Sequence, residues 1–444
     1  MTTRAAVLSI GDELTLGQIA ECNARWIAHE LLRVGVIVSE HRTVADDRSA
    51  IAAAITALAN QVALVIVTGG LGPTEDDLTR EGVADALGGA RQVEGQLAEC
   101  PQARTQIEQR FATRGIAMPL SNLRQAQCPV GATLLKNSHG TAPGIAAQID
   151  RAHLFCLPGP PHEMQLMFTT HVLPLALSLV QDAGGAAVGV CAVHSCGLSE
   201  SLAAQRIHAL MVRTANPLAG TTASCHVVTA RIRATGNAAI DGSLQRAACE
   251  VERAWGVYAF GRDEMTLAEA LGEVLRARGE CVAVAESCTG GGIGQSMTSA
   301  PGSSEWFDGG WISYRDDFKC EFLGVDEKLL QARGAVSEQV ACAMALGAAQ
   351  RANTRWGVSA TGIAGPTGGT HDKPIGTVWI AVADRAPGVD GISTRAREFR
   401  FSGNRASIRQ STCTTAVQLV RLAALGHAEL RLSSELTSSG TRIQ

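Results

Sequence analysis

The segment AESCTGGG combines hydroxyl side chains with a run of glycines. Ser287 and Thr289 stand directly before Gly290 and Gly291, where an apolar strand pattern gives way to a helix. Glycine lets the backbone approach a ligand closely, and the free N–H groups at a helix start favour an anion or a developing oxyanion. Ser287 is therefore a candidate nucleophile with Thr289 beside it, although either residue could instead simply cap the helix.

A serine nucleophile needs a base, and the histidines nearby lie in a polar loop or near the tail. Lys319 follows Ser313 and Tyr314 by about one helical turn in the segment SYRDDFK. Burial disfavours the charged form of an amine, and a serine–lysine pair is a known variant of the nucleophile–base arrangement. The alternative is that Lys319 is a solvated helix residue that pairs with Asp316 or Glu321.

Two further segments of the C-terminal third could hold a phosphorylated ligand. In the glycine-rich segment GIAGPTGG, Gly362 and Gly365 follow the strand that ends at Thr361, so the loop could close over a ribose or a phosphate. Arg405 and Arg409 are four residues apart at the start of the last predicted helix, so they share one face and could fork a phosphate. A surface turn and ordinary surface arginines are the alternatives.

The segment TGGLGPTEDDLT could cradle a phosphate with its backbone. Carboxylates also stand at the ends of the predicted strands, and carboxylates beside a phosphate usually indicate a bridging hard cation such as Mg²⁺. Asp12, Asp76 and Asp77 are the candidate ligands, although the last two could instead cap the helix that begins at Leu78. The substrate-binding residues expected in this part of the chain are Asn23, Gly69, Gly70, Gly72, Thr74, Gly140 and Thr141.

These candidates lie where strand patterns end, in two regions that alternate strand and helix signals. Strands are predicted over residues 5–10, 36–39, 62–68, 281–286, 311–314, 357–361 and 377–383. Such alternation is typical of a doubly wound α/β sheet, in which ligands bind at the carboxyl ends of the strands. The predicted fold class is a multi-domain α/β protein: 1–172 a doubly wound α/β domain, 173–262 a small α+β domain, 263–428 an α/β domain and 429–444 a disordered tail.

Composition narrows the class of protein. The 444 residues are 46% hydrophobic and 18% charged, and the net charge of −4 gives no global attraction to nucleic acid or an anionic membrane. The 13 cysteines are scattered without a CxxC pair, which argues against a disulfide framework and a zinc cage. Because no signal peptide and no apolar stretch of about 18 residues is expected, the predicted compartment is the cytoplasm.

The segments AESCTGG, GAVSEQVACAMA, GIAGPTGG, KPIGTVW and FSGNR occur in this order and together resemble the C-terminal domain of the CinA family. That family is associated with deamidation of nicotinamide mononucleotide. The resemblance implies Ser287 as nucleophile and Lys319 as base, with Tyr314 nearby and Arg405 or Arg409 near the phosphate. It implies no cofactor for this reaction.

The segments SIGDELTLGQ, TGGLGPTEDDLT, HGTAPG and LPGPPHE resemble the molybdopterin-binding-like domain that begins full-length CinA proteins. The resemblance implies an ADP-ribose pyrophosphatase in which Mg²⁺, Mn²⁺ or Co²⁺ is held by Asp12, Asp76 and Asp77. Small nucleotides are the expected partners and a homodimer is the expected assembly, with neither nucleic acid nor a membrane as partner. The alternatives are a deamidase whose N-terminal domain only binds a nucleotide or drives dimerisation, and a non-enzymatic competence factor.

Overall fold

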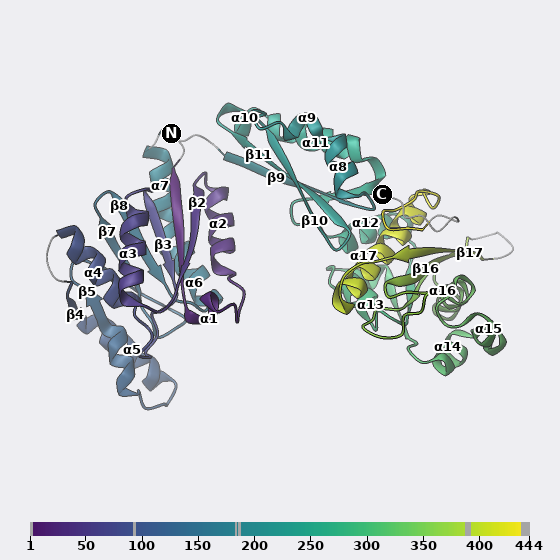
Figure 1. Cartoon of the computed structure of the whole chain (residues 1–444), viewed down its shortest axis with the longest axis horizontal. Coiled ribbons are helices and arrows are strands. Elements are labelled where there is room, and N and C mark those ends of the chain that lie inside the picture. The colour runs from purple at the N-terminus through teal and green to yellow at the C-terminus, as the bar shows by residue number, and fades with distance from the viewer. Residues whose placement is uncertain (1–2, 92–94, 183, 185–187, 387–391, 437–444) are drawn as a thin grey trace. The chain divides into compact units, whose positions relative to one another are not determined.

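The computed structural model of the chain describes residues 3–91, 95–182, 184, 188–386 and 392–436 (Figure 1). The chain divides into two compact units. Unit 1 comprises Met1–Val190 with Ala234–Asp241, and unit 2 comprises Cys191–Arg233 with Gly242–Gln444. The segment predicted as a separate middle domain, 173–262, is therefore shared between the two units, and most of it groups with the C-terminal region.

Unit 1 begins with the predicted alternation of strands and helices. Its elements are β1 (Arg4–Ile10), α1 (Asp12–Thr15), α2 (Asn23–Arg33), β2 (Ile37–Val44), α3 (Arg48–Ala59), β3 (Leu64–Thr68), α4 (Thr79–Arg91), β4 (Leu97–Glu99), α5 (Pro101–Thr113), β5 (Gln127–Pro129), β6 (Thr133–Leu135), β7 (Gly144–Ile149), β8 (Ala152–Leu157), α6 (Pro161–Met167) and α7 (Leu173–Asp182). A 3₁₀ segment, Leu120–Ala126, precedes β5, and a π-helical segment, Phe168–Val172, joins α6 to α7.

The main sheet of unit 1 has the order β2-β1-β3-β8-β7-β6. The first four strands are parallel to one another, β7 is antiparallel to β8, and β6 is antiparallel to β7. Helices cover both faces, so β3 and all of β1 after Arg4 are buried and read as largely apolar runs. Ile51 and Ile55 of α3 pack on one face, while Ile27 and Leu31 of α2 pack on the other (Figure 1). This arrangement brings the carboxyl ends of β1, β3 and β8 to one edge.

One helical segment, Pro161–Asp182, is long and apolar enough to cross a membrane by length and composition alone. The prediction that no segment would reach that length is therefore wrong for this helix. A core helix passes the same test, and here Met164, Phe168 and Val172 are buried against the sheet of unit 1. Among the described residues, no other helix meets the criterion.

Unit 2 contains two sheets. The smaller has the order β10-β11-β9-β12 and the larger the order β14-β13-β15-β16-β17, in which β14, β13 and β15 are parallel. The elements are β9 (Val188–Cys196), α8 (Glu200–Arg206), α9 (His208–Met211), β10 (Leu218–Ser224), β11 (Val227–Thr235), α11 (Ser243–Trp255), β12 (Ala259–Arg262), α12 (Leu267–Arg278), β13 (Val282–Glu286), α13 (Gly292–Thr298), β14 (Phe307–Ile312), α14 (Asp316–Leu323), α15 (Glu327–Arg333), α16 (Glu338–Ala352), β15 (Trp356–Gly362), β16 (Thr377–Asp384), β17 (Ser393–Arg400) and α17 (Arg405–Ala424). The short helix α10 (Asn237–Ile240) falls in the segment that groups with unit 1.

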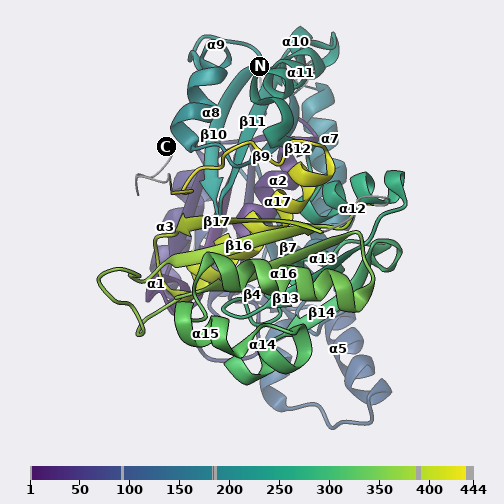
Figure 2. The same cartoon turned by 90° about the vertical axis from the view of Figure 1, so that its right-hand side faces the viewer.

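The larger sheet of unit 2 is covered differently on its two faces. Figure 2 shows α16 in front of the strands and α17 behind them. Ala283 and Ala285 of β13 pack on the side of α14, α15 and α16, whereas Val284 packs on the side of α12, α13 and α17. Because side chains alternate along a strand, each position of β13 belongs to one of these two cores.

The smaller sheet is tied to α17 by polar contacts. Gln418 donates its side-chain N–H to the carbonyl of Cys196 at 2.9 Å. Arg421 donates to the carbonyls of Val257 and Ala259 at 3.0 and 2.9 Å. These buried side chains satisfy backbone groups of the smaller sheet, which explains why that sheet belongs to the same unit as α17.

The predicted disordered tail does not begin at residue 429. Glu435 forms a bridge to Phe399 at the edge strand β17 and an ion pair with Arg397 at 3.2 Å, and Leu432 is buried. The segment 429–436 is therefore packed on unit 2. Leu432 is its buried apolar contact, and Glu435 pairs with Arg397 and Phe399 of the edge strand β17. Residues 437–444 lie outside the described residues.

Candidate functional site

Three hydroxyl side chains stand in one row at the carboxyl ends of β14, β13 and β15. Glu286 is in register with Ile312 on one side and with Ala360 on the other, so Ser287 lies between Ser313 and Thr361. The backbone ladder continues one residue further. The N–H of Ser313 donates to the backbone carbonyl of Glu286 at 2.8 Å, and the N–H of Ser287 donates to the backbone carbonyl of Ala360 at 3.0 Å. The sequence prediction that Ser287 follows a buried strand is confirmed.

The alternation of β13 relates Ser287 to the helix that carries the predicted base. Ala283 and Ala285 pack on the side of α14 and α16, and Ser287 is the next position of that alternating set, one residue beyond the end of the strand. Lys319 lies on α14, which packs on this face through Leu323. The alternation therefore predicts that the residue expected as nucleophile faces the side of the sheet that α14 covers.

Lys319 is almost completely buried, with 1% of its side chain exposed. Its Nζ donates to the carbonyl of Tyr314 at 3.2 Å and to Asp316 at 3.0 Å. The amine thus lies beside the connection between Ser313 and α14. The structure combines both sequence alternatives, since the side chain is buried as a base would be and is also paired with Asp316.

The turn after β13 is held by a carboxylate rather than by a hydroxyl cap. Glu286 is 1% exposed, and its two oxygens accept from the N–H groups of Gly291, Ile293 and Gly294 at 2.9, 3.1 and 2.8 Å. Neither Ser287 nor Thr289 caps α13, whose N-cap Gly291 makes no side-chain bond. The prediction that the amides at the helix start would hold an oxyanion is wrong for these three groups, because Glu286 already occupies them.

Two buried hydroxyls of this site have no partner among the described residues. Thr289 Oγ1 and Ser313 Oγ are both enclosed and make no hydrogen bond, whereas Thr361 Oγ1 donates to Ala335 at 2.9 Å. An unpaired buried hydroxyl costs stability, so such groups mark places where a ligand or water completes the site. Cys288 is a poor nucleophile here, because burial raises the pKa of its thiol to about 12.

Arg405 and Arg409 lie at the start of α17, as predicted, and each holds a glycine-rich loop. Arg405 donates to the carbonyl of Gly365 at 2.7 Å and to the hydroxyl of Tyr314 at 3.1 Å. Arg409 donates to the carbonyl of Thr289 at 2.6 Å. The two cations therefore contact the turns that follow β13, β14 and β15.

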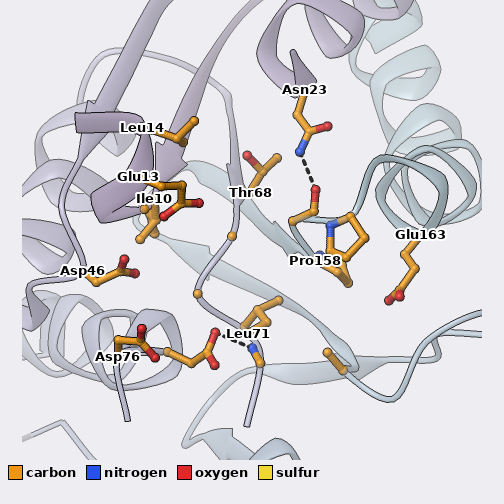
Figure 3. A pocket seen from close by; sticks show the side chains of 18 of the residues that line it. Ile10, Glu13, Leu14, Asn23, Asp46, Thr68, Leu71, Asp76, Pro158 and Glu163 are labelled. Atoms are coloured by element: carbon orange, nitrogen blue, oxygen red, sulfur yellow. Dashed lines mark hydrogen bonds between the residues drawn. The ribbon is translucent and has the colours of Figure 1, made fainter. Parts of the chain in front are cut away.

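Unit 1 contains a separate cavity of about 610 Å³ at the carboxyl ends of its parallel strands. Figure 3 shows Glu13 and Asp46 on one side of it and Glu163 on the other. Asn23 closes one wall, because its side-chain N–H donates to the carbonyl of Gly159 at 2.8 Å. The predicted binding residues that line this cavity are Asn23, Gly69, Gly70, Gly72, Thr74 and Thr141.

The glycine-rich loop of unit 1 requires glycine for steric reasons. Gly69 and Gly70 have φ values of +100° and +62°, a conformation that other residues rarely adopt. A Cβ at Gly69 would overlap the carbonyl of Ile10, and one at Gly70 would overlap Thr79 Oγ1. Glycine at these positions therefore lets the loop pack closely on β1 and α4 while it lines the cavity. The N–H groups of Gly69, Gly72 and Thr74 already donate to Leu157 and Asp77.

The predicted metal ligands do not gather into one set. Asp77 accepts from the N–H groups of Gly72 and Thr74 at 2.6 and 2.8 Å, so its oxygens close the loop instead of capping α4 or facing a metal. The carboxylate of Asp12 accepts from the N–H of Asp46, the Asp12 N–H donates to the carboxylate of Asp46, and Asp12 does not line the cavity. Within the described part of the chain, no group of three or more histidine, cysteine, aspartate or glutamate side chains could hold a metal ion.

Sequence reasoning missed Asp46, which lines the cavity near Asp76. Burial raises the pKa of Asp46, and the charges of Asp12, Glu13 and Asp76 raise it further against a backbone hydrogen bond that lowers it. The strand before it was expected to end at Ser39, but β2 continues to Val44. An acidic residue after the true end of that strand was the missing signal.

Family models match both halves of the chain. The model described as "CinA C-terminal domain" matches residues 264–424, and the model described as "Probable molybdopterin binding domain" matches residues 6–177. Residues from Ser287 to Arg409 fall in the first match, and the cavity of unit 1 falls in the second.

Similar proteins agree with these matches. A CinA-like protein of Thermosynechococcus vestitus is 39% identical over 423 residues, which is 94% of this chain and 98% of the relative. A CinA-like protein of Synechocystis is 40% identical over 384 residues, covering 86% and 90% of the two chains. A solved structure of the competence/damage inducible protein CihA from Agrobacterium tumefaciens is 36% identical and covers 36% of this chain and 97% of its own, with a TM-score of 0.33. The chain belongs to the CinA family.

Proposed function

We propose that unit 2 deamidates nicotinamide mononucleotide to nicotinic acid mononucleotide and ammonia. The observation that carries this proposal is that Ser287 directly follows the β13 positions that pack on the side of α14, the helix that carries the buried Lys319, and stands beside the unpaired hydroxyl of Ser313. A buried amine near a serine at a strand end fits a nucleophile and its base. Arg405 and Arg409 supply the positive charge that a ribose phosphate needs.

The proposed reaction has two halves. In the proposed first half, Lys319 acts as the base that takes the proton of Ser287 Oγ while the oxygen attacks the carboxamide carbon. The C–N bond then breaks, the proton passes from Lys319 to the leaving nitrogen, and ammonia departs from an acyl-serine. Water attacks this ester with Lys319 again taking the proton, which releases the carboxylate and restores Ser287.

Because Glu286 occupies three amides of α13, a different set must stabilise the tetrahedral oxyanion. The N–H groups of Cys288 and Thr289 follow the nucleophile directly, and we assign this role to them. The carbonyl of Thr289 is held by Arg409, which fixes the orientation of the peptide units in this turn.

The test compares two adjacent side chains. We expect Ser287→Ala to lower ammonia release from nicotinamide mononucleotide by about 10³-fold or more, since removal of a nucleophile leaves only residual catalysis. Cys288→Ser is the matched control and should keep most of the activity. If Ser287→Ala turns over normally while the protein remains folded by circular dichroism, the proposal is wrong.

For unit 1 we propose nucleotide binding, which the glycine cradle and the 610 Å³ cavity support. The expected hydrolysis of ADP-ribose stays a prediction. Asp12, Asp76 and Asp77 do not form one set of metal ligands among the described residues. Incubation of the full chain with ADP-ribose and Mg²⁺, Mn²⁺ or Co²⁺ tests this directly. AMP formation would support hydrolysis, whereas binding without AMP would support binding alone.

A further inference from the structure

A second cavity of unit 1, of about 470 Å³, lies between α5 and the loop 136–143. Three of the side chains that line it are cationic, namely Arg110, Arg114 and Lys136, and no carboxylate lines it. The neighbouring 610 Å³ cavity has the opposite character, since acidic side chains line it and no lysine or arginine does. Thr141 lines both cavities, so a change of charge sign occurs across one residue.

Arg114 and Lys136 differ from the neighbouring Arg104 in having no carboxylate partner among the described residues. Arg104 on α5 is paired with Glu99 and Glu108, at 3.0 and 2.9 Å. Arg114 and Lys136 are exposed and make no ion pair among the described residues. Two unpaired cations that converge on one hollow create a local positive potential, which salt bridges have neutralised elsewhere on the helix.

The wall between the two cavities is held in place by side chains. Arg110 donates to the carbonyl of Ser138 at 2.8 Å and also to that of His139, and its enclosed Nε has no partner among the described residues. Asn137 accepts from the N–H groups of His139 and Gly140 at 2.9 and 2.8 Å. A loop fixed in this way loses little conformational entropy when a ligand binds.

We propose that this basic cavity binds a phosphate group, as the anionic part of the ligand whose remaining part enters the acidic cavity. The inference rests on the proposal that unit 1 binds a nucleotide, and it adds where the phosphate goes. Arg114 and Lys136 provide the charge, and Thr141, on the fixed loop, lines both cavities. Charge-assisted hydrogen bonds to phosphate are the strongest contacts that such a surface can make.

The experiment measures binding of inorganic pyrophosphate and, separately, of adenosine to the full chain without divalent metal. We expect the double variant Arg114→Ala with Lys136→Ala to weaken pyrophosphate binding by about tenfold or more, as the loss of a charge-assisted contact implies. The control carries the same charge change on exposed arginines outside both cavities, Arg25→Ala with Arg151→Ala, and should bind as the wild type does.

The outcomes separate the two proposals. Pyrophosphate binding that depends on Arg114 and Lys136, without adenosine binding, would support the phosphate site and contradict nucleotide binding. Pyrophosphate that does not bind, or that binds the double variant as tightly as the wild type, would overturn the phosphate site. Binding only to the arginines of unit 2 would give that second result, because neither substitution touches unit 2.

Discussion

The two glycine-rich turns of this protein are each closed by one carboxylate, yet they present opposite charge to a ligand. In unit 2, Glu286 holds the turn after Ser287 from a fully buried position. In unit 1, Asp77 holds the turn after Gly70 from a half-buried position. The same device therefore operates in a dry environment in one unit and in a wet one in the other.

The charges that surround the two turns explain what each can bind. In unit 2, Lys319, Arg405 and Arg409 contact the turns that carry the row of hydroxyls, and positive charge near these turns favours an anionic ligand. In unit 1 the larger cavity carries the acidic residues Asp46 and Glu163, so an anion must be placed beside it or be accompanied by a cation. The comparison predicts that substitutions in one unit leave the other's binding unchanged.

The largest effect is expected from Lys319→Met, which keeps the apolar stem and removes the amine. We expect kcat for ammonia release to fall by about 10³-fold, the magnitude typical of a lost general base. Lys328→Met on the adjacent helix α15 is the matched control, because that residue is exposed. Unchanged kcat in the Lys319 variant would contradict its role as the base. Altered pyrophosphate binding by unit 1 in that variant would contradict the separation of the two sites.

A middle-sized effect distinguishes the two clamping carboxylates. Glu286→Ala removes a buried carboxylate and leaves three amides, that of Ile293 fully buried, without their acceptor, so it should cost about 3 kcal/mol of unfolding free energy. Asp77→Ala, where water can replace the bonds, should cost about 1 kcal/mol. Urea unfolding followed by tryptophan fluorescence reports mainly on unit 2, which contains every tryptophan except Trp26. Hydrogen exchange of residues 68–79 reports on the turn of unit 1.

The exposed residues Glu273 and Glu75 provide controls for that comparison, and Glu273→Ala and Glu75→Ala should leave unfolding nearly unchanged. Equal losses in the two clamp variants would show that burial does not decide the strength of these bonds. The difference between the units would then have another cause.

The sequence predicted the elements that are buried on both faces better than those at the edges. β13 reads as an apolar run that ends at Glu286, so Ser287 was placed correctly. β2 is an edge strand with alternating polarity, so the apolar signal stopped at Ser39 and Asp46 was missed. The role of Glu286 could not be predicted, because the amides it accepts from come five to eight residues later and depend on the path of the turn.

The smallest effect concerns the acidic character of unit 1. Burial raises the pKa of Asp46 above its ordinary value near 3.8, and the charges of Asp12, Glu13 and Asp76 add to the rise. The native state therefore binds this proton more tightly than the unfolded chain, so the stability that Asp46 contributes at low pH is lost as pH rises from about 3.8 through the raised native pKa. We expect Asp46→Asn to raise Tm slightly at pH 7 and not at pH 3, and less so at high salt because screening weakens the repulsion. A Tm that falls equally at both pH values would mean that the bond from the Asp12 N–H outweighs the repulsion, and that the acidic cavity is not strained by its own charges.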